Sequence, residues 1–174
     1  MTSGKLPRLT VVLGGARSGK SAYAEGLLTA EPGPWAYIAT AEAHDDEMRV
    51  RIAQHQGRRA TGWTTIDAPL DLAGALSGAA AGTPVLVDCL TLWLANLILA
   101  PHDIPTATDR LIDALSRRSK PCILVSNEIG LSIVPDNALA RAFRDEAGRL
   151  NQRVAAAADR VVFIAAGLPL TLKG

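Results

Sequence analysis

The stretch GGARSGKS, residues 14–21, has the residue types and spacing needed to hold a phosphate chain. Gly14 is followed after four residues by Gly19, Lys20 and Ser21, which is the P-loop pattern. Glycines let a backbone wrap an anion with its N–H groups pointing inward, and a helix that begins there presents its positive N-terminus. The lysine reaches the terminal phosphates and the serine hydroxyl can hold Mg²⁺. The pattern predicts a nucleoside triphosphate site, the alternative being a Gly-rich turn without a ligand.

The residues on either side of this loop favour the phosphate-binding interpretation. LTVVL, residues 9–13, is typical of a buried strand, and SAYAEGLL, residues 21–28, has a helical pattern. Asp88 ends another apolar run, VLVD, and an acidic residue there is the usual partner of the Mg²⁺ of a P-loop. A helix cap or a turn residue is the alternative for Asp88. We therefore expect Mg²⁺ on Ser21 and Asp88, although a P-loop alone does not distinguish a kinase, an ATPase and a switch.

The elements that position these residues are expected from the pattern of apolar residues. Continuous apolar runs predict strands buried on both faces, at residues 9–15, 35–40, 85–89, 122–128 and 161–167. A helix is expected over residues 138–158, where Asn137 can cap a seam with a spacing of three and four. The seam consists of Leu139, Phe143, Ala147, Leu150, Val154 and Ala157. The alternation predicts an α/β fold, a single P-loop NTPase-like domain over residues 1–174 with a mostly parallel central sheet flanked by helices.

Composition and charge narrow the class of protein. The net charge of +1 gives no electrostatic footprint for nucleic acid or an anionic membrane. Cys89 and Cys122 sit inside apolar runs without metal-ligand or disulfide spacing, which indicates a reducing compartment. The longest apolar stretch, residues 85–100, is short for a membrane span and carries Asp88 and Asn96. We expect a cytoplasmic protein with no membrane span and no nucleic acid partner.

Three segments together resemble one known family. They are GGARSGKS, YIATAEAHDDEMRVRIAQHQGRR and SNEIGLSIVPDNALARAFRDEAGRLNQRVAAAADRV. Over residues 9–173 the chain resembles the bifunctional adenosylcobinamide kinase / adenosylcobinamide-phosphate guanylyltransferase family of cobalamin biosynthesis. The resemblance implies phosphorylation of the aminopropanol hydroxyl of adenosylcobinamide by ATP or GTP. It then implies transfer of GMP from GTP to that phosphate, giving adenosyl-GDP-cobinamide and pyrophosphate, in a homotrimer.

The resemblance places the family's guanylylated histidine on His55. Family members often carry a second histidine just before it, where this chain has Gln54, so His55 is the sole imidazole of RIAQHQGRR. From the residues alone, Arg51 and His55 lie four apart on an expected helix that Gly57 can cap, and an ordinary polar residue at a helix end is the alternative. A nucleophilic imidazole must be neutral, and a free pKa of about 6.5 leaves it mostly neutral at cytoplasmic pH.

The resemblance also implies which residues bind GTP, beside the catalytic His55 and Lys20. The phosphate loop contributes Gly15, Ala16, Arg17, Ser18, Gly19, Lys20, Ser21 and Ala22. The other positions are Ala39, Thr40, Ala41, Gln56, Gly57, Arg58, Arg59, Asp67 and Asp88. Arg58 and Arg59 can neutralise phosphate charge or form an exposed basic turn. Asp67 can accept a hydrogen bond from a guanine edge or cap the next helix.

The sequence leaves the roles of several other polar residues open. Asn127 and Glu128 end the fourth expected strand, where they can orient the cobinamide hydroxyl or the metal, or simply form a turn. The arginines of residues 138–158 either contact substrate or a neighbouring subunit, or face solvent. His44 and His102 are interpreted as a helix-start or loop residue and a solvated loop residue. Two rival functions also stay open, a kinase with a structural His55 and a GTP-binding regulatory module.

Overall fold

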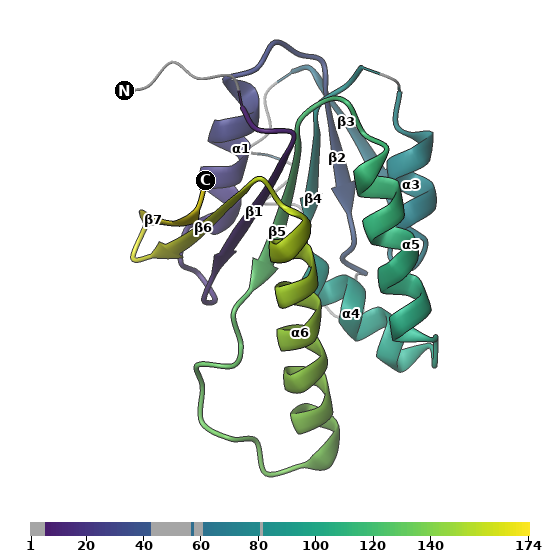
Figure 1. Cartoon of the computed structure of the whole chain (residues 1–174), viewed down its shortest axis with the longest axis vertical. Helices are drawn as coiled ribbons and strands as arrows, with labels where there is room; N and C mark the ends of the chain where they lie inside the picture. Colours follow the sequence, from purple (N-terminus) through teal and green to yellow (C-terminus); the bar gives the residue numbers. More distant parts are fainter. Residues whose placement is uncertain (1–5, 43–56, 58–60, 81) are drawn as a thin grey trace.

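A seven-stranded sheet runs through the part of the chain that the computed structural model describes, residues 6–42, 57, 61–80 and 82–174 (Figure 1). The strand order is β3-β2-β4-β5-β1-β6-β7. The strands are β1 (Leu9–Gly14), β2 (Trp35–Ala39), β3 (Trp63–Asp67), β4 (Val85–Asp88), β5 (Cys122–Asn127), β6 (Arg160–Ala165) and β7 (Leu168–Lys173). All neighbouring pairs are parallel except β6 and β7, which are antiparallel. The predicted mostly parallel α/β sheet is confirmed.

Helices cover both faces of this sheet. The described helices are α1 (Lys20–Thr29), α3 (Leu72–Gly78), α4 (Leu90–Leu99), α5 (Ile104–Ser116) and α6 (Ala138–Ala157). Helix α1 packs on one face, and α3, α4, α5 and α6 pack on the other. Val11 of β1 belongs to the core on the second face and its neighbour Val12 to the core beneath α1, and both are fully buried. Burial on both faces explains why the central strands read as continuous apolar runs.

The five expected strands are present, with ends that differ by up to two residues, but β3 and β7 were not predicted. Both are edge strands of the sheet. Trp63–Asp67 has no buried residue and carries two threonines, whereas Leu168–Lys173 is exposed throughout and contains Pro169. Apolar continuity identifies strands with two covered faces, so it does not find edge strands of this kind.

The long helix is confirmed as Ala138–Ala157, and the Asn137 side chain caps it by accepting a hydrogen bond from the Ala140 N–H at 2.7 Å. One residue of the predicted seam is wrong. Leu139 is 61% exposed, because the first turns of α6 extend beyond the carboxyl ends of the strands (Figure 1). Leu150 and Val154, further along the same seam, are buried against the sheet as expected.

The parallel strands bring their carboxyl ends to one rim of the sheet. Gly14, Ala39, Asp67, Asp88 and Asn127 are the last residues of β1, β2, β3, β4 and β5. Ligands of open α/β sheets bind at this rim. None of the helices in the described part of the chain has the length and apolarity needed to cross a bilayer.

We predict that the core depends on the buried face of α4. Leu94→Ala should lower the free energy of unfolding by about 2–5 kcal/mol, because Leu94 is fully buried and its removal leaves a cavity. Leu99→Ala, the same substitution on the same helix, should change it by less than about 0.5 kcal/mol, because Leu99 is 69% exposed. Urea unfolding of both variants measures the difference. Equal losses would contradict the assigned burial of α4.

Candidate active site

The phosphate loop joins β1 to α1 in a conformation that requires glycine at its start. A Cβ on Gly14 would lie 2.7 Å from the backbone oxygen of Ile164 in β6, closer than a real contact allows. Arg17 and Gly19 adopt left-handed backbone conformations, with φ of 56° and 95°. Such residues turn successive N–H groups inward to form an anion-binding concavity. The loop therefore ends at the N-terminus of α1 with its amide groups arranged for phosphate.

The β6–β7 hairpin supports this loop. Its two turn residues, Ala166 and Gly167, have φ of 50° and 79°, as expected for a two-residue hairpin turn. The Gly167 N–H donates to the Ser18 oxygen at 2.9 Å. A small residue pair between the runs VVFIA and LPLTL was the sequence signal for this hairpin, which the strand prediction missed. The last strand thus contributes to the site through its turn.

Lys20, the first residue of α1, lies against the loop. Its side chain is 9% exposed, and Nζ donates to the Gly15 oxygen at 3.0 Å. Burial lowers the pKa of Lys20 below its ordinary value, and negative charge on Cys89 or Asp88 opposes this. Burial also raises the pKa of Cys89 to about 12, so Cys89 is a neutral thiol near pH 7. Because Cys89 is neutral, Asp88 is the neighbouring group that opposes the lowering of the Lys20 pKa.

Asp88 ends β4, which is separated from β1 by β5. Its Oδ2 atom is buried and has no hydrogen-bond partner among the described residues. A buried carboxylate oxygen costs free energy unless a donor or a cation satisfies it. The N-cap of α4 is Cys89, without a side-chain cap bond, so the helix-cap interpretation of Asp88 is not supported. The orphaned oxygen fits a role as a ligand of Mg²⁺.

The remaining donor set also fits Mg²⁺. Ser21 is the second residue of α1 and is half-buried beside Lys20. No group of three or more His, Cys, Asp or Glu side chains gathers within the described ranges. Mg²⁺ bound beside nucleotide phosphates needs only one or two protein ligands, since water and phosphate supply the rest. A serine and an aspartate are sufficient for such a site.

The ends of β2 and β3 are level with Asp88. Ala39 pairs in register with Asp67 on one side and with Asp88 on the other. Asp67 is exposed at the rim, and the cap of α3 is Asp71, which accepts from the Gly74 N–H at 3.1 Å. The helix-cap interpretation of Asp67 is therefore wrong. Thr40 is fully buried, and its hydroxyl is bonded to the backbone of Cys89.

A buried polar network fixes the end of β5 beside the loop. The Asn127 N–H donates to Thr91 Oγ1 at 2.7 Å, and its oxygen accepts from Asn151 Nδ2 at 3.1 Å. Ser126 Oγ donates to Asn151 Oδ1 at 2.7 Å. The sequence prediction did not find Thr91, Ser126 or Asn151, whose partners lie 24 to 36 residues away along the chain. The network ties β5 to α4 and α6.

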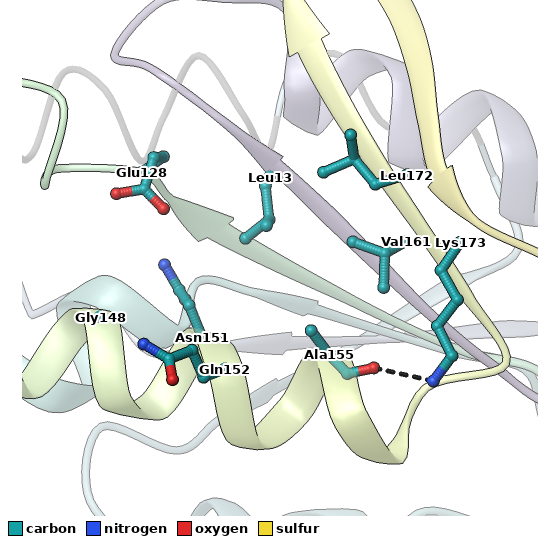
Figure 2. Close-up of a pocket in the computed structure, with 9 residues that line it drawn as sticks. All are labelled: Leu13, Glu128, Gly148, Asn151, Gln152, Ala155, Val161, Leu172 and Lys173. Carbon is teal, nitrogen blue, oxygen red and sulfur yellow. Dashed lines mark hydrogen bonds between the residues drawn. The ribbon is translucent and has the colours of Figure 1, made fainter.

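Glu128 follows Asn127 at the rim, and its N–H donates to the Gly14 oxygen at 3.1 Å. Its Oε1 accepts from the Gly130 N–H at 2.8 Å, which is the turn-stabilising role that the sequence left open. Glu128 also borders a cavity of about 440 Å³ on the α6 side of the sheet (Figure 2). There it faces the same space as Asn151 (Figure 2). No residue of the phosphate loop after Gly14 lines this cavity.

Several expected site residues lie outside the described residues. They are His55, Gln56, Arg58 and Arg59. His44, for which no site role was expected, also lies outside them. Gly57 is described and is exposed, and His102 is exposed in a loop, as predicted. The arginines of α6 bond within the protein, Arg141 to loop oxygens, Arg144 to Asp145, Arg149 to Glu146 and Arg153 to Asp109.

The strand–loop–helix unit and the acidic end of β4 define a P-loop nucleotide-binding fold. A solved structure with the same fold is the flagellar accessory protein FlaH from Methanocaldococcus jannaschii, with a TM-score of 0.55 and 13% identity. The match covers 98% of this chain and 81% of FlaH. At this identity the likeness shows the fold alone.

The family is shown by sequence. Residues 10–172 match the CobU family model, "Cobinamide kinase / cobinamide phosphate guanyltransferase". The bifunctional adenosylcobalamin biosynthesis protein CobP of Pseudomonas aeruginosa is 49% identical over 167 residues, covering 94% of this chain and 96% of that protein. Its counterpart CobU of Salmonella typhimurium is 39% identical over 181 residues, covering 95% and 99%. The chain belongs to the CobU family.

We predict different effects for alanine at the two first glycines of the loop. Gly14→Ala should lower the free energy of unfolding by about 1–3 kcal/mol, because its methyl group meets the Ile164 oxygen. Gly15→Ala is the matched control, since a Cβ there has nothing within 4 Å, and should stay within about 1 kcal/mol of wild type. Urea unfolding distinguishes the two, and equal effects would refute the close approach of β1 and β6.

Proposed function

We propose that the chain catalyses both reactions of its family. It phosphorylates the aminopropanol hydroxyl of adenosylcobinamide and then transfers GMP from GTP to the resulting phosphate. The observation that carries this proposal is the rim itself, where the phosphate loop and Lys20 lie together with an Asp88 oxygen that has no partner among the described residues. Near full-length similarity to relatives named as bifunctional supports the same conclusion.

In the kinase step, ATP or GTP lies with its phosphates against the backbone N–H groups of residues 15–21. Lys20 binds the terminal phosphates and stabilises the charge that develops on the transferred group. Ser21 and Asp88 would hold Mg²⁺, which neutralises charge on the phosphate oxygens when bound. Asn127 and Glu128 stand beside Gly14 at the rim and orient the substrate hydroxyl. The hydroxyl oxygen attacks the terminal phosphorus, and the nucleoside diphosphate leaves.

In the guanylyltransferase step, neutral His55 attacks the α-phosphorus of GTP. A nitrogen–phosphorus bond forms as the bond to pyrophosphate breaks. An oxygen of the cobinamide phosphate then attacks the same phosphorus, which releases His55 and gives adenosyl-GDP-cobinamide. Gln56, Gly57, Arg58 and Arg59 contact the phosphates, and Asp67 accepts from the guanine edge. The covalent intermediate divides one difficult transfer into two easier ones.

The proposal extends to the assembly and its surroundings. The chain acts as a single domain, in a homotrimer with sites between subunits, in the cytoplasm. It binds nucleotide and cobinamide substrates, with no nucleic acid or membrane partner. The two rival functions are less well supported, because the relatives at 49% and 39% identity are both named as bifunctional.

A labelling experiment tests the covalent step. The protein is incubated with GTP labelled at the α-phosphate, denatured and separated from free nucleotide. Wild-type protein should carry an acid-labile label that is absent in His55→Ala, because the proposal places the phosphoramidate on the His55 imidazole. His102→Ala is the matched control and should label normally, since His102 is an exposed loop residue.

The same experiment separates the rival functions. Absence of label together with intact cobinamide phosphorylation would leave a kinase with a structural His55. Absence of both label and cobinamide turnover would favour the regulatory module. If His55→Ala still carries the label, the intermediate lies on another residue, which would contradict the assignment of His55 as the nucleophile.

A further inference from the structure

The family resemblance places Thr40 among the GTP contacts. In the structure its side chain is buried, and its hydroxyl is hydrogen-bonded within the protein. Thr40 is 0% exposed. Its Oγ1 donates to the Cys89 oxygen at 2.7 Å and accepts from the Cys89 N–H at 2.8 Å. A threonine hydroxyl has a single proton to donate, and here Cys89 takes it. The side chain therefore has neither a free proton nor exposed surface with which to contact a nucleotide.

The backbone of Thr40 is also hydrogen-bonded to the end of β4 and to α4. Its N–H donates to the Asp88 oxygen at 3.3 Å, and its own oxygen accepts from Asn96 Nδ2 at 2.8 Å. Asn96 lies on α4 and is 7% exposed. The same amide nitrogen also donates to the Pro69 oxygen at 3.1 Å. We call Thr40, Cys89 and Asn96 the Thr40 brace, which fastens the chain after β2 and β3 to the junction between β4 and α4.

The brace holds the backbone that directly follows the Cα atom of Asp88. Two of its bonds hold Cys89, the next residue, and a third holds the carbonyl of Asp88 itself. The buried Oδ2 of Asp88 makes no hydrogen bond of its own within the described ranges. Its position is therefore determined by the backbone that carries it. Mutation of a group that orients a metal ligand typically lowers metal affinity by about ten- to a hundredfold.

We propose that Thr40 and Asn96 are positioning residues for the Mg²⁺–nucleotide complex, which act by fixing Asp88 and do not touch the nucleotide through their side chains. The proposal rests on the proposed function, specifically on Asp88 as a ligand of Mg²⁺. It changes the role of Thr40 from a contact to a support, and it adds Asn96, a residue on α4 that no motif of the sequence identifies.

The distinguishing consequence is a change in Mg²⁺ dependence. Thr40→Val keeps the branched shape of the side chain but removes both hydrogen bonds to Cys89, so the backbone next to Asp88 loses two of the three bonds by which Thr40 holds it. Thr40→Ser retains the hydroxyl and should restore them. Thr108→Val is the matched control, because Thr108 is 2% exposed and its hydroxyl donates within α5, to the Ile104 oxygen.

The test is equilibrium binding of GTP to the full chain, measured over a Mg²⁺ titration and again in EDTA. Thr40→Val should raise the Mg²⁺ concentration for half-maximal tight binding by roughly ten- to a hundredfold, with little change in EDTA. Thr40→Ser and Thr108→Val should follow wild type. Asn96→Ala, which removes the donor to the Thr40 oxygen, should shift Mg²⁺ dependence in the same direction and gives a second variant should Thr40→Val fold poorly.

An Asp88→Asn arm separates failure of this proposal from failure of the proposed function. If Asp88→Asn retains the normal Mg²⁺ dependence, Asp88 is not a ligand, and its proposed role in the kinase step fails together with this proposal. The other outcome is that Asp88→Asn loses the Mg²⁺ dependence of GTP binding, while Asn96→Ala and a folded Thr40→Val keep it. The brace then has no positioning role, and the proposed function is unaffected. Equal weakening of binding in Mg²⁺ and in EDTA would also overturn the proposal, because it would indicate general support of the fold.

Discussion

The close packing of Gly14 against the Ile164 oxygen is the constraint on which the site depends. It allows β1 and β6 to lie side by side up to the point where the chain leaves the sheet, with only 2.7 Å available at the place of a side chain. The loop then turns through two left-handed residues and is held by the hydrogen bond from Gly167 to Ser18. The position of Lys20 at the start of α1 follows from this path.

The strand order places the phosphate loop and Asp88 on two sides of one site. Because β5 lies between β1 and β4, the phosphate loop and Asp88 flank the end of β5 at one rim. Buried hydrogen bonds fix the end of β5 through Asn151 and the end of β4 through Thr40. Unsatisfied buried polar groups are costly, so such networks hold one arrangement firmly. The backbone that carries the rim residues is thus held in one arrangement.

The sequence was sufficient for the parts whose signal is local. The phosphate loop, the five strands buried on both faces and the capped helix α6 each have a pattern of spacing or apolar continuity, and each was predicted. The edge strands β3 and β7 lack that pattern because water reaches their exposed residues. The roles of Thr40, Asn96 and Asn151 depend on partners 24 to 56 residues away, which a local pattern does not encode. Leu139 was misplaced because α6 outreaches the sheet.

The central claim is that one nucleotide site at this rim serves both reactions. Its most direct test is the parallel assay of cobinamide phosphorylation and of GMP transfer to cobinamide phosphate in Lys20→Ala, with the exposed Lys120→Ala as control. If the Lys20 ammonium group binds the phosphates in both steps, as the proposal requires, both rates should fall by at least about a hundredfold, while the control retains them. Loss of phosphorylation with GMP transfer at the wild-type rate would show two separate nucleotide sites and contradict the account.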